Sequence, residues 1–105
     1  MANGDLTKEI EYDKIEVVST WNIQVRKATK VMEEQADGSK KELTRSFHRH
    51  VLVPFSSQKD SDDKWTHTAT DLSSEDASVK AIAEAAWTDN VKTAYKTFKE
   101  SQTTL

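Results

Sequence analysis

A run of alternating apolar and polar residues in the first third of the chain most restricts its fold. Successive side chains of a β-strand point to opposite faces, so a period of two predicts a strand with one buried face. The alternation predicts a long strand over residues 15–34, with a bend or bulge within it. Six apolar side chains of this run occupy odd positions: Ile15, Val17, Trp21, Ile23, Val25 and Val31.

A turn and a second strand follow this run. The segment 36–40 (Ala-Asp-Gly-Ser-Lys) predicts a turn, because Gly38 can adopt positive φ. The second strand is expected over residues 42–55 and ends near Pro54, which cannot donate to a strand ladder. Together the two strands form an antiparallel hairpin.

The charges in the hairpin argue for its register. A two-residue loop would place Arg26 opposite Arg49, and like charges directly opposite destabilise a sheet. It would also place Lys30 opposite Arg45. A three- or five-residue loop instead collects the apolar residues on one face. The predicted pairs are then Trp21 with Phe55, Ile23 with Val53, Val25 with Val51 and Thr29 with Phe47.

The segments on either side of the hairpin differ in character. Residues 1–13 carry four acids and predict a solvated leader, which can join a sheet edge through Ile10 and Tyr12. Residues 56–72 predict an acidic loop, and alternation over 64–69 indicates a short third strand within it.

Two helices are predicted over residues 73–101. Ser73 or Ser74 can cap the first helix, and Thr88 can cap the second. Apolar residues recur at helical spacing in both. The expected buried stripes are Val79, Ile82, Ala83, Ala86 and Trp87 in the first helix and Val91, Ala94, Tyr95 and Phe98 in the second.

The predicted fold is therefore α+β: a long antiparallel hairpin (14–55), with room for a third or fourth strand, packed against two C-terminal helices. Residues 14–105 form one domain in this reading, since 105 residues leave no room for a second. Ten of the apolar residues are alanine, so the core is thin and the chain is expected to gain burial by association. Trp21, Val25, Trp87 and Phe98 should contribute most to stability.

Composition excludes several functional classes. The chain has no cysteine, so disulfides, thiolate metal sites and cysteine nucleophiles are ruled out. Its two glycines, Gly4 and Gly38, cannot form a dinucleotide fingerprint or a P-loop. The N-terminal residues do not resemble a signal peptide, and no apolar run approaches the ~20 residues of a membrane span. We expect no cofactor and no membrane contact.

Two weaker features suggest metal chemistry. His48 and His50 share a strand face and could approach one ion with His67, but arginines flank the pair and no acid lies within three residues. The acids from Asp60 to Asp71 match part of a calcium loop, which requires glycine where Trp65 stands. Solvated histidines and an ordinary acidic loop explain both, so no metal site is assigned. Nothing places a nucleophile beside a base, and no catalytic residues are assigned.

A basic cluster in the hairpin is the best candidate site. Residues 14–53 hold eight Lys and Arg against five acids, a net charge of +3, whereas residues 55–90 hold three lysines against eight acids, a net charge of −5. The cluster could bind phosphates, dock the acidic 55–90 segment of a neighbouring copy, or simply form a solvated strand face. In the preferred register Lys27 lies opposite Arg49. The candidate residues are Arg26, Lys27, Lys30, Arg45, Phe47 and Arg49.

Several short motifs carry a family resemblance over residues 14–96. They are Lys14-Ile-Glu-Val-Val, Ile23-Gln-Val-Arg, Arg45-Ser-Phe-His-Arg-His-Val, the Ser-x-Glu-Asp start of the first helix and Ala86-Trp-Thr. In these the chain resembles small uncharacterised proteins of tailed bacteriophages, particularly marine ones. The resemblance implies a phage-encoded protein and makes it a candidate for association with the virion. It implies no activity and no catalytic residue.

These observations favour a non-enzymatic interaction or assembly protein in the host cytoplasm or the virion. It would self-associate or dock a protein partner through its basic hairpin. The alternative is a small nucleic-acid-binding accessory protein that contacts phosphates with the same lysines and arginines.

Overall fold

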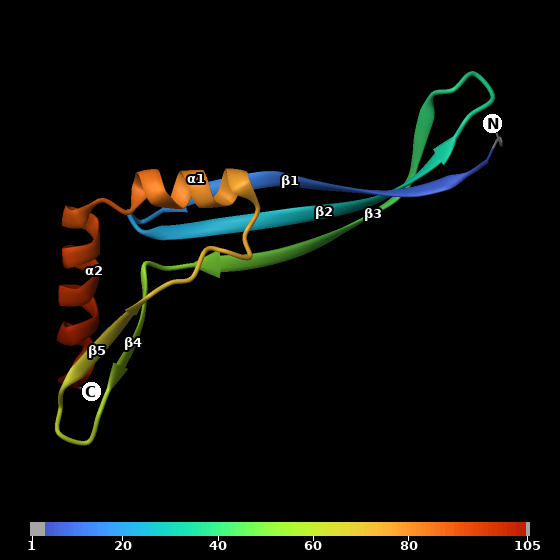
Figure 1. Ribbon diagram of the computed structural model, residues 1–105. Coiled ribbons are helices and arrows are strands. Elements are labelled where there is room, and N and C mark those ends of the chain that lie inside the picture. Colours follow the sequence, from blue (N-terminus) through green and yellow to red (C-terminus); the bar gives the residue numbers. More distant parts are fainter. Residues whose placement is uncertain (1–3, 105) are drawn as a thin grey trace. The chain divides into compact units, whose positions relative to one another are not determined.

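The computed structural model describes residues 4–104 and contains two sheets and two α-helices (Figure 1). Strands β1, β2 and β3 form an antiparallel sheet in that order, and β4 and β5 form a second sheet. The predicted α+β class is confirmed. The elements are β1 (Leu6–Val18), β2 (Asn22–Glu34), β3 (Lys40–Leu52), β4 (Phe55–Lys59), β5 (Trp65–Ala69), α1 (Ala77–Ala86), α2 (Asp89–Glu100) and a final 3-10 turn (Ser101–Thr104).

The predicted single strand over 15–34 is two strands joined by a tight turn. Ser19 and Thr20 adopt positive φ angles of 56° and 78°, which reverse the chain between β1 and β2. The turn leaves the odd–even alternation unbroken, so the pattern did not reveal it. Residues 6–13, expected as a leader, form the first part of β1. Residues 1–3 of that leader lie outside the described residues.

The turn between β2 and β3 spans residues 36–38, so its three-residue length is one of the two that the sequence left open. It is centred on residue 37, whereas the predicted strand pairs require residue 38 at the centre. The Gly38 amide donates to the Gln35 carbonyl at 3.0 Å, and the Gln35 amide donates to the Ser39 carbonyl at 2.7 Å. Gly38 takes φ of 87°, a conformation that costs glycine little. However, β3 ends at Leu52, and Phe55 belongs to β4. Trp21 lies in the turn before β2 and Val53 lies after the end of β3, so the predicted strand pairs Trp21–Phe55 and Ile23–Val53 are wrong.

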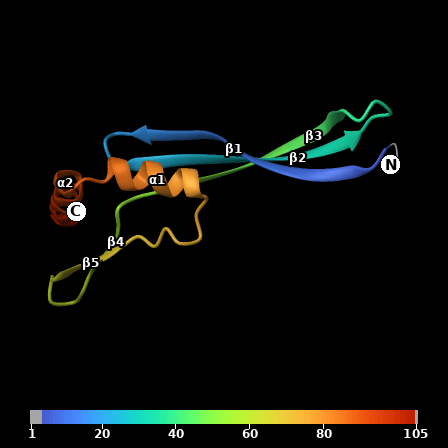
Figure 2. The same ribbon diagram turned by 45° about the horizontal axis from the view of Figure 1, so that its top comes forward.

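The segment expected as an acidic loop is mostly a β-hairpin. Strands β4 and β5 pair antiparallel from Phe55 with Ala69 to Lys59 with Trp65, so the short strand expected at 64–69 is confirmed (Figure 2). The Asp60 carboxylate accepts the amides of Asp62 and Lys64 at 2.8 and 2.9 Å. These bonds assign the first acid of the apparent calcium motif to a turn.

Both predicted helices are present, and one of the two predicted caps is correct. Thr88 caps α2, where its hydroxyl accepts the Val91 amide. Asp76, rather than Ser73 or Ser74, caps α1 and accepts the Ser78 amide at 3.1 Å. Asp, Asn, Ser and Thr are all good N-cap residues, so composition could not choose among them.

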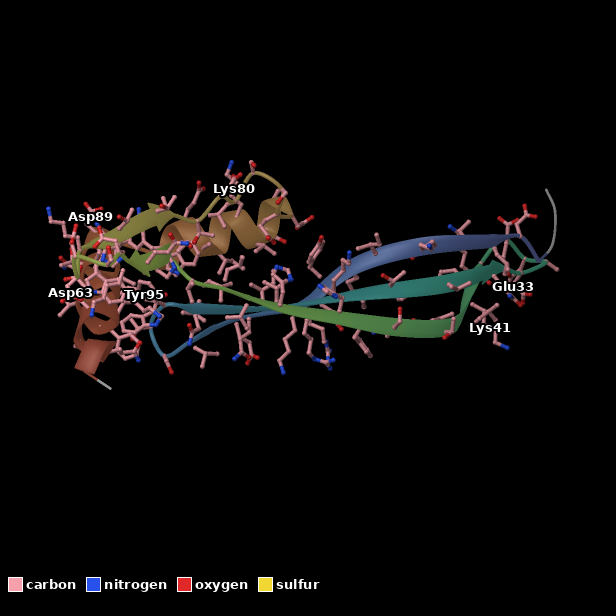
Figure 3. All side chains as sticks on the ribbon, turned by 90° about the horizontal axis from the view of Figure 1, so that it is seen from below. Glu33, Lys41, Asp63, Lys80, Asp89 and Tyr95 are labelled. Carbon is pink, nitrogen blue, oxygen red and sulfur yellow. The ribbon has the colours of Figure 1, made fainter. Side chains whose placement is uncertain are left out.

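The chain divides into two compact units. Unit 1 comprises residues 1–15 and 25–50, and unit 2 comprises residues 16–24 and 51–105. Unit 2 contains most of the buried apolar residues, including Tyr95, which Figure 3 labels on α2. Phe98, expected in the core, is 42% exposed, and Trp21 is half-buried. The buried apolar residues of unit 2 are Ile23, Phe55, Val79, Ala83, Trp87 and Tyr95.

Candidate interaction surface

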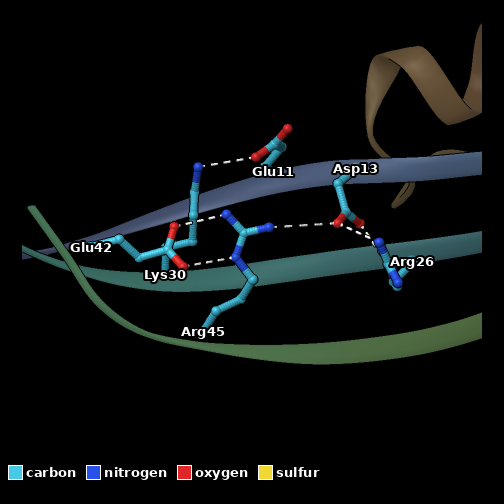
Figure 4. A network of polar contacts seen from close by, with 6 residues as sticks. All are labelled: Glu11, Asp13, Arg26, Lys30, Glu42 and Arg45. Atoms are coloured by element: carbon cyan, nitrogen blue, oxygen red, sulfur yellow. Dashed lines mark hydrogen bonds and ion pairs between the residues drawn. The ribbon is translucent and has the colours of Figure 1, made fainter.

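Six charged side chains form a network across the three strands of unit 1 (Figure 4). Each strand contributes two of them, and we call this set the ionic network. It comprises Glu11 and Asp13 from β1, Arg26 and Lys30 from β2, and Glu42 and Arg45 from β3. The network therefore connects residues that are up to 34 positions apart in sequence.

Asp13 lies at the centre of the network. Arg26 donates to both of its carboxylate oxygens, from Nε at 2.9 Å and from Nη2 at 2.8 Å. Arg45 Nη1 lies 3.9 Å from the same carboxylate. The hydrogen bond from Arg26 holds the pKa of Asp13 below its usual value, so this side chain is ionised at neutral pH.

The other cations of the network also have acidic partners. Lys30 Nζ donates to Glu11 at 3.0 Å. Arg45 makes a two-pronged contact with Glu42, at 3.0 Å from Nε and 2.7 Å from Nη2, which lowers the pKa of Glu42. Three of the five cations predicted to bind a ligand are therefore already paired with carboxylates.

Phe47 carries the only aromatic ring among the predicted site residues, and three arginines surround it. The guanidinium carbons of Arg26, Arg49 and Arg45 lie 4.5, 5.5 and 6.0 Å from its ring centroid. Phe47 is nevertheless 43% exposed. The structure thus brings these four predicted residues together. Lys27 lies outside the group and makes no ion pair within residues 4–104.

The contact between Arg26 and Phe47 overturns the predicted face assignment. We expected Phe47 on the apolar face opposite Thr29, but Phe47 shares the face of Arg26. A local break in alternation accounts for the difference. Glu42 and Arg45 are three residues apart and would point to opposite faces of a regular strand, yet their side chains are in contact. Such breaks are typical of β-bulges.

Exposed apolar side chains accompany the charges on both outer strands of unit 1. Leu6 and Ile10 on β1 are exposed, as are Leu43 and Phe47 on β3. Every residue from 40 to 49 is exposed. Figure 3 labels Glu33 on β2 and Lys41 on β3 near one end of the sheet, where side chains project on both sides of the ribbon. These features mark β1 and β3 as candidate contact strands.

Unit 2 contains a polar trio that sequence reasoning missed. The Ser57 hydroxyl lies 2.7 Å from His67 Nδ1, and His67 Nε2 lies 2.7 Å from a Glu100 carboxylate oxygen. The trio joins β4, β5 and α2, and the His67 ring also stacks on Trp65. Alternate spacing placed His67 on a strand, but only the pairing of β4 with β5 put Ser57 opposite it.

An open hollow of about 340 Å³ lies elsewhere in unit 2. Pro54, Leu72 and Trp87 contribute apolar walls, and Glu84 and Lys92 contribute one charge of each sign. None of the trio lines this hollow. The rings of His48 and His50, in unit 1, lie 5.9 Å apart, and no group of three metal-ligating side chains gathers anywhere among residues 4–104.

The chain was compared with protein-family models, with curated proteins and with solved structures. No protein-family model, curated protein or solved structure matches it. Neither of the two α-helices within residues 4–104 has the length and apolar character needed to cross a bilayer. The chemistry of the described residues must therefore support any functional proposal.

Proposed function

We propose that this protein is a non-enzymatic assembly protein of a tailed bacteriophage, acting in the host cytoplasm or within the virion. It associates through the strands of unit 1, with further copies of itself or with a protein partner. The phage assignment is supported by the short motifs of residues 14–96, whereas the mode of action is supported by the structure of unit 1.

The thin core of unit 1 is the observation that carries the proposal. Within its described residues only Val25 and Ala28 are buried apolar residues, and no helix belongs to the unit. A sheet of three strands needs a buried hydrophobic face or a packed neighbour for independent stability. Four large apolar side chains stay exposed on its outer strands. Association would bury them at a gain of ~25 cal/mol per Å².

The ionic network gives such an interface specificity more than affinity. Its carboxylates and cations neutralise one another within unit 1, so they stiffen the strands without a partner. The pairs that Lys30 and Arg45 make with Glu11 and Glu42 are exposed, and such pairs contribute only ~0–1 kcal/mol each, so association draws on the apolar residues and on backbone hydrogen bonds. Charges at the rim then select the orientation in which two surfaces meet.

The same pairing argues against the nucleic-acid alternative. Phosphate binding uses cations that are available to replace counterions. Arg26, Lys30 and Arg45 are occupied by carboxylates, which leaves Lys27 and Arg49 of the predicted set. Two cations would support only weak binding.

The Ser57–His67–Glu100 trio is interpreted here as structural. Its hydrogen bonds tie β4 and β5 to α2, and each has the geometry of an ordinary bond. Nucleophilic catalysis needs, in addition, a substrate cavity and donors for a developing oxyanion. The hollow beside Trp87 is lined by other residues.

Sedimentation over a range of protein concentrations and salt concentrations tests the proposal. We expect species larger than the monomer that dissociate on dilution. A monomer under every condition would refute self-association. A parallel titration with duplex DNA at two salt concentrations tests the alternative, which requires binding that falls steeply as salt rises.

A further inference from the structure

We infer that unit 1 associates by pairing the β1 edge of one copy with the β3 edge of the next. This inference rests on the proposed self-association and names the two surfaces that meet. The order β1-β2-β3 leaves these two strands at the edges of the sheet. A strand at a sheet edge presents unpaired N–H and C=O groups, which a second strand can satisfy.

The two edges have opposite charge. Within unit 1, β1 (residues 6–15) carries two lysines and three acids, a net charge of −1. β3 carries four Lys and Arg and one acid, a net charge of +3, together with two histidines. Two β3 edges would bring arginines against arginines, and two β1 edges would bring acids against acids. Glu9, Glu11 and Asp13 of β1 are already paired with Lys40, Lys30 and Arg26 of the same copy, so the preference for the unlike pair rests on the net charges of the two edges rather than on new ion pairs.

The apolar residues and the lengths of the two edges also match. Leu6 and Ile10 on β1 are four residues apart, as are Leu43 and Phe47 on β3, so each pair shares the spacing of one strand face. Within unit 1 the β1 edge offers ten strand residues, 6–15, and the β3 edge offers eleven, 40–50. At ~3.3 Å per residue these edges present ~33 and ~36 Å of backbone.

Unlike edges cannot saturate each other in a single pair of copies. After β1 of one copy pairs with β3 of the next, one β3 edge and one β1 edge stay open. Such a contact propagates into a closed ring or an open filament rather than a symmetric dimer.

Two edge variants that are mixed together test this inference. The first, Leu6→Lys with Ile10→Lys, adds charge to the β1 edge. The second, Leu43→Thr with Phe47→Thr, removes both exposed apolar side chains from the β3 edge while keeping good strand formers. All four positions are exposed, so both variants should fold, as judged by circular dichroism. Thr93→Lys with Thr97→Lys adds two charges to exposed positions of α2 and serves as the matched control.

Mass measurement by sedimentation gives a distinct result for each mode of contact. We expect each edge variant alone to fall to the mass of one chain, the equimolar mixture to rise to exactly two chains, and the control to assemble like the wild type. The mixture stops at two because each partner keeps one intact edge. Dimers of either variant alone would overturn the inference, as would a mixture that stays monomeric.

Two further outcomes separate this inference from the proposed function. If the wild type assembles and both edge variants assemble equally well, the edges are not the contact and only this inference fails. If the wild type stays monomeric, self-association fails as well.

Discussion

Replacement of Trp87 provides the sharpest test of how unit 2 is held together. Trp87 is 6% exposed, and its indole Nε1 donates to the Trp21 carbonyl at 2.8 Å. Truncation of a buried tryptophan to alanine costs ~3–5 kcal/mol. A domain of this size has a free energy of unfolding near ~5–15 kcal/mol, so Trp87→Ala should lose a large part of it. Trp87→Phe keeps a ring but leaves the carbonyl without its donor, at ~1–3 kcal/mol.

Urea unfolding followed by tryptophan fluorescence measures these losses. All three tryptophans lie in unit 2, so the signal reports on that unit. With a slope of ~1–3 kcal/mol per M, Trp87→Ala should lower the midpoint by more than ~1 M, and Trp87→Phe should lie between it and the wild type. Phe98→Ala is the matched control, because Phe98 is 42% exposed and should cost less. An unchanged midpoint for Trp87→Ala, or a larger loss for Phe98→Ala, would refute the reasoning.

Three further predictions follow from the same structure. Tenfold dilution of the wild type should lower its Tm by roughly 4–7 °C, because association stabilises the folded chain by mass action; a Tm that is independent of concentration in scanning calorimetry contradicts association. Asp13→Asn should destabilise the protein at pH 7, and the difference in urea midpoint should shrink on acidification. The reason is that the pKa of Asp13 is lower in the folded chain than in the unfolded chain. Its contribution to the free energy of unfolding is therefore complete above the unfolded pKa of about 4 and is lost as pH falls through the folded pKa. A difference in urea midpoint that is constant with pH would contradict this. Ser57→Ala should cost ~1 kcal/mol through the lost bond to His67, and a fluorophosphonate probe should leave the wild type unmodified by mass spectrometry; labelling at Ser57 would contradict the non-enzymatic proposal.

Local sequence patterns predicted those features whose interacting groups all lie within one short segment of the chain. A turn within residues 36–40 follows from Gly38, and the Thr88 cap follows from side-chain chemistry at the start of a helix. Val79, Ala83 and Trp87 are buried at the predicted helical spacing. In each case the interacting groups lie within a few residues of one another.

Patterns failed where two different structures share one periodicity. The alternation from Ile15 to Val31 continues across the turn at Ser19 and Thr20, so a hairpin and a single long strand produce the same sequence signal. Val17 illustrates the consequence, since it follows the apolar pattern and is nevertheless exposed. Whether Val17 is buried depends on the strand that contains it, β1, and not on its odd position in the sequence.

By itself the sequence determined the α+β class, the presence of the two helices, the Thr88 cap of the second helix, and the opposite charges of the two halves of the chain. Only the tertiary structure decided which side chains meet: Asp13 with Arg26, Phe47 with three arginines, and Ser57 with His67. The physical reason is the strand register. A bulge of one residue exchanges the faces of every residue beyond it, and its energy depends on contacts between strands rather than on the composition of any one of them.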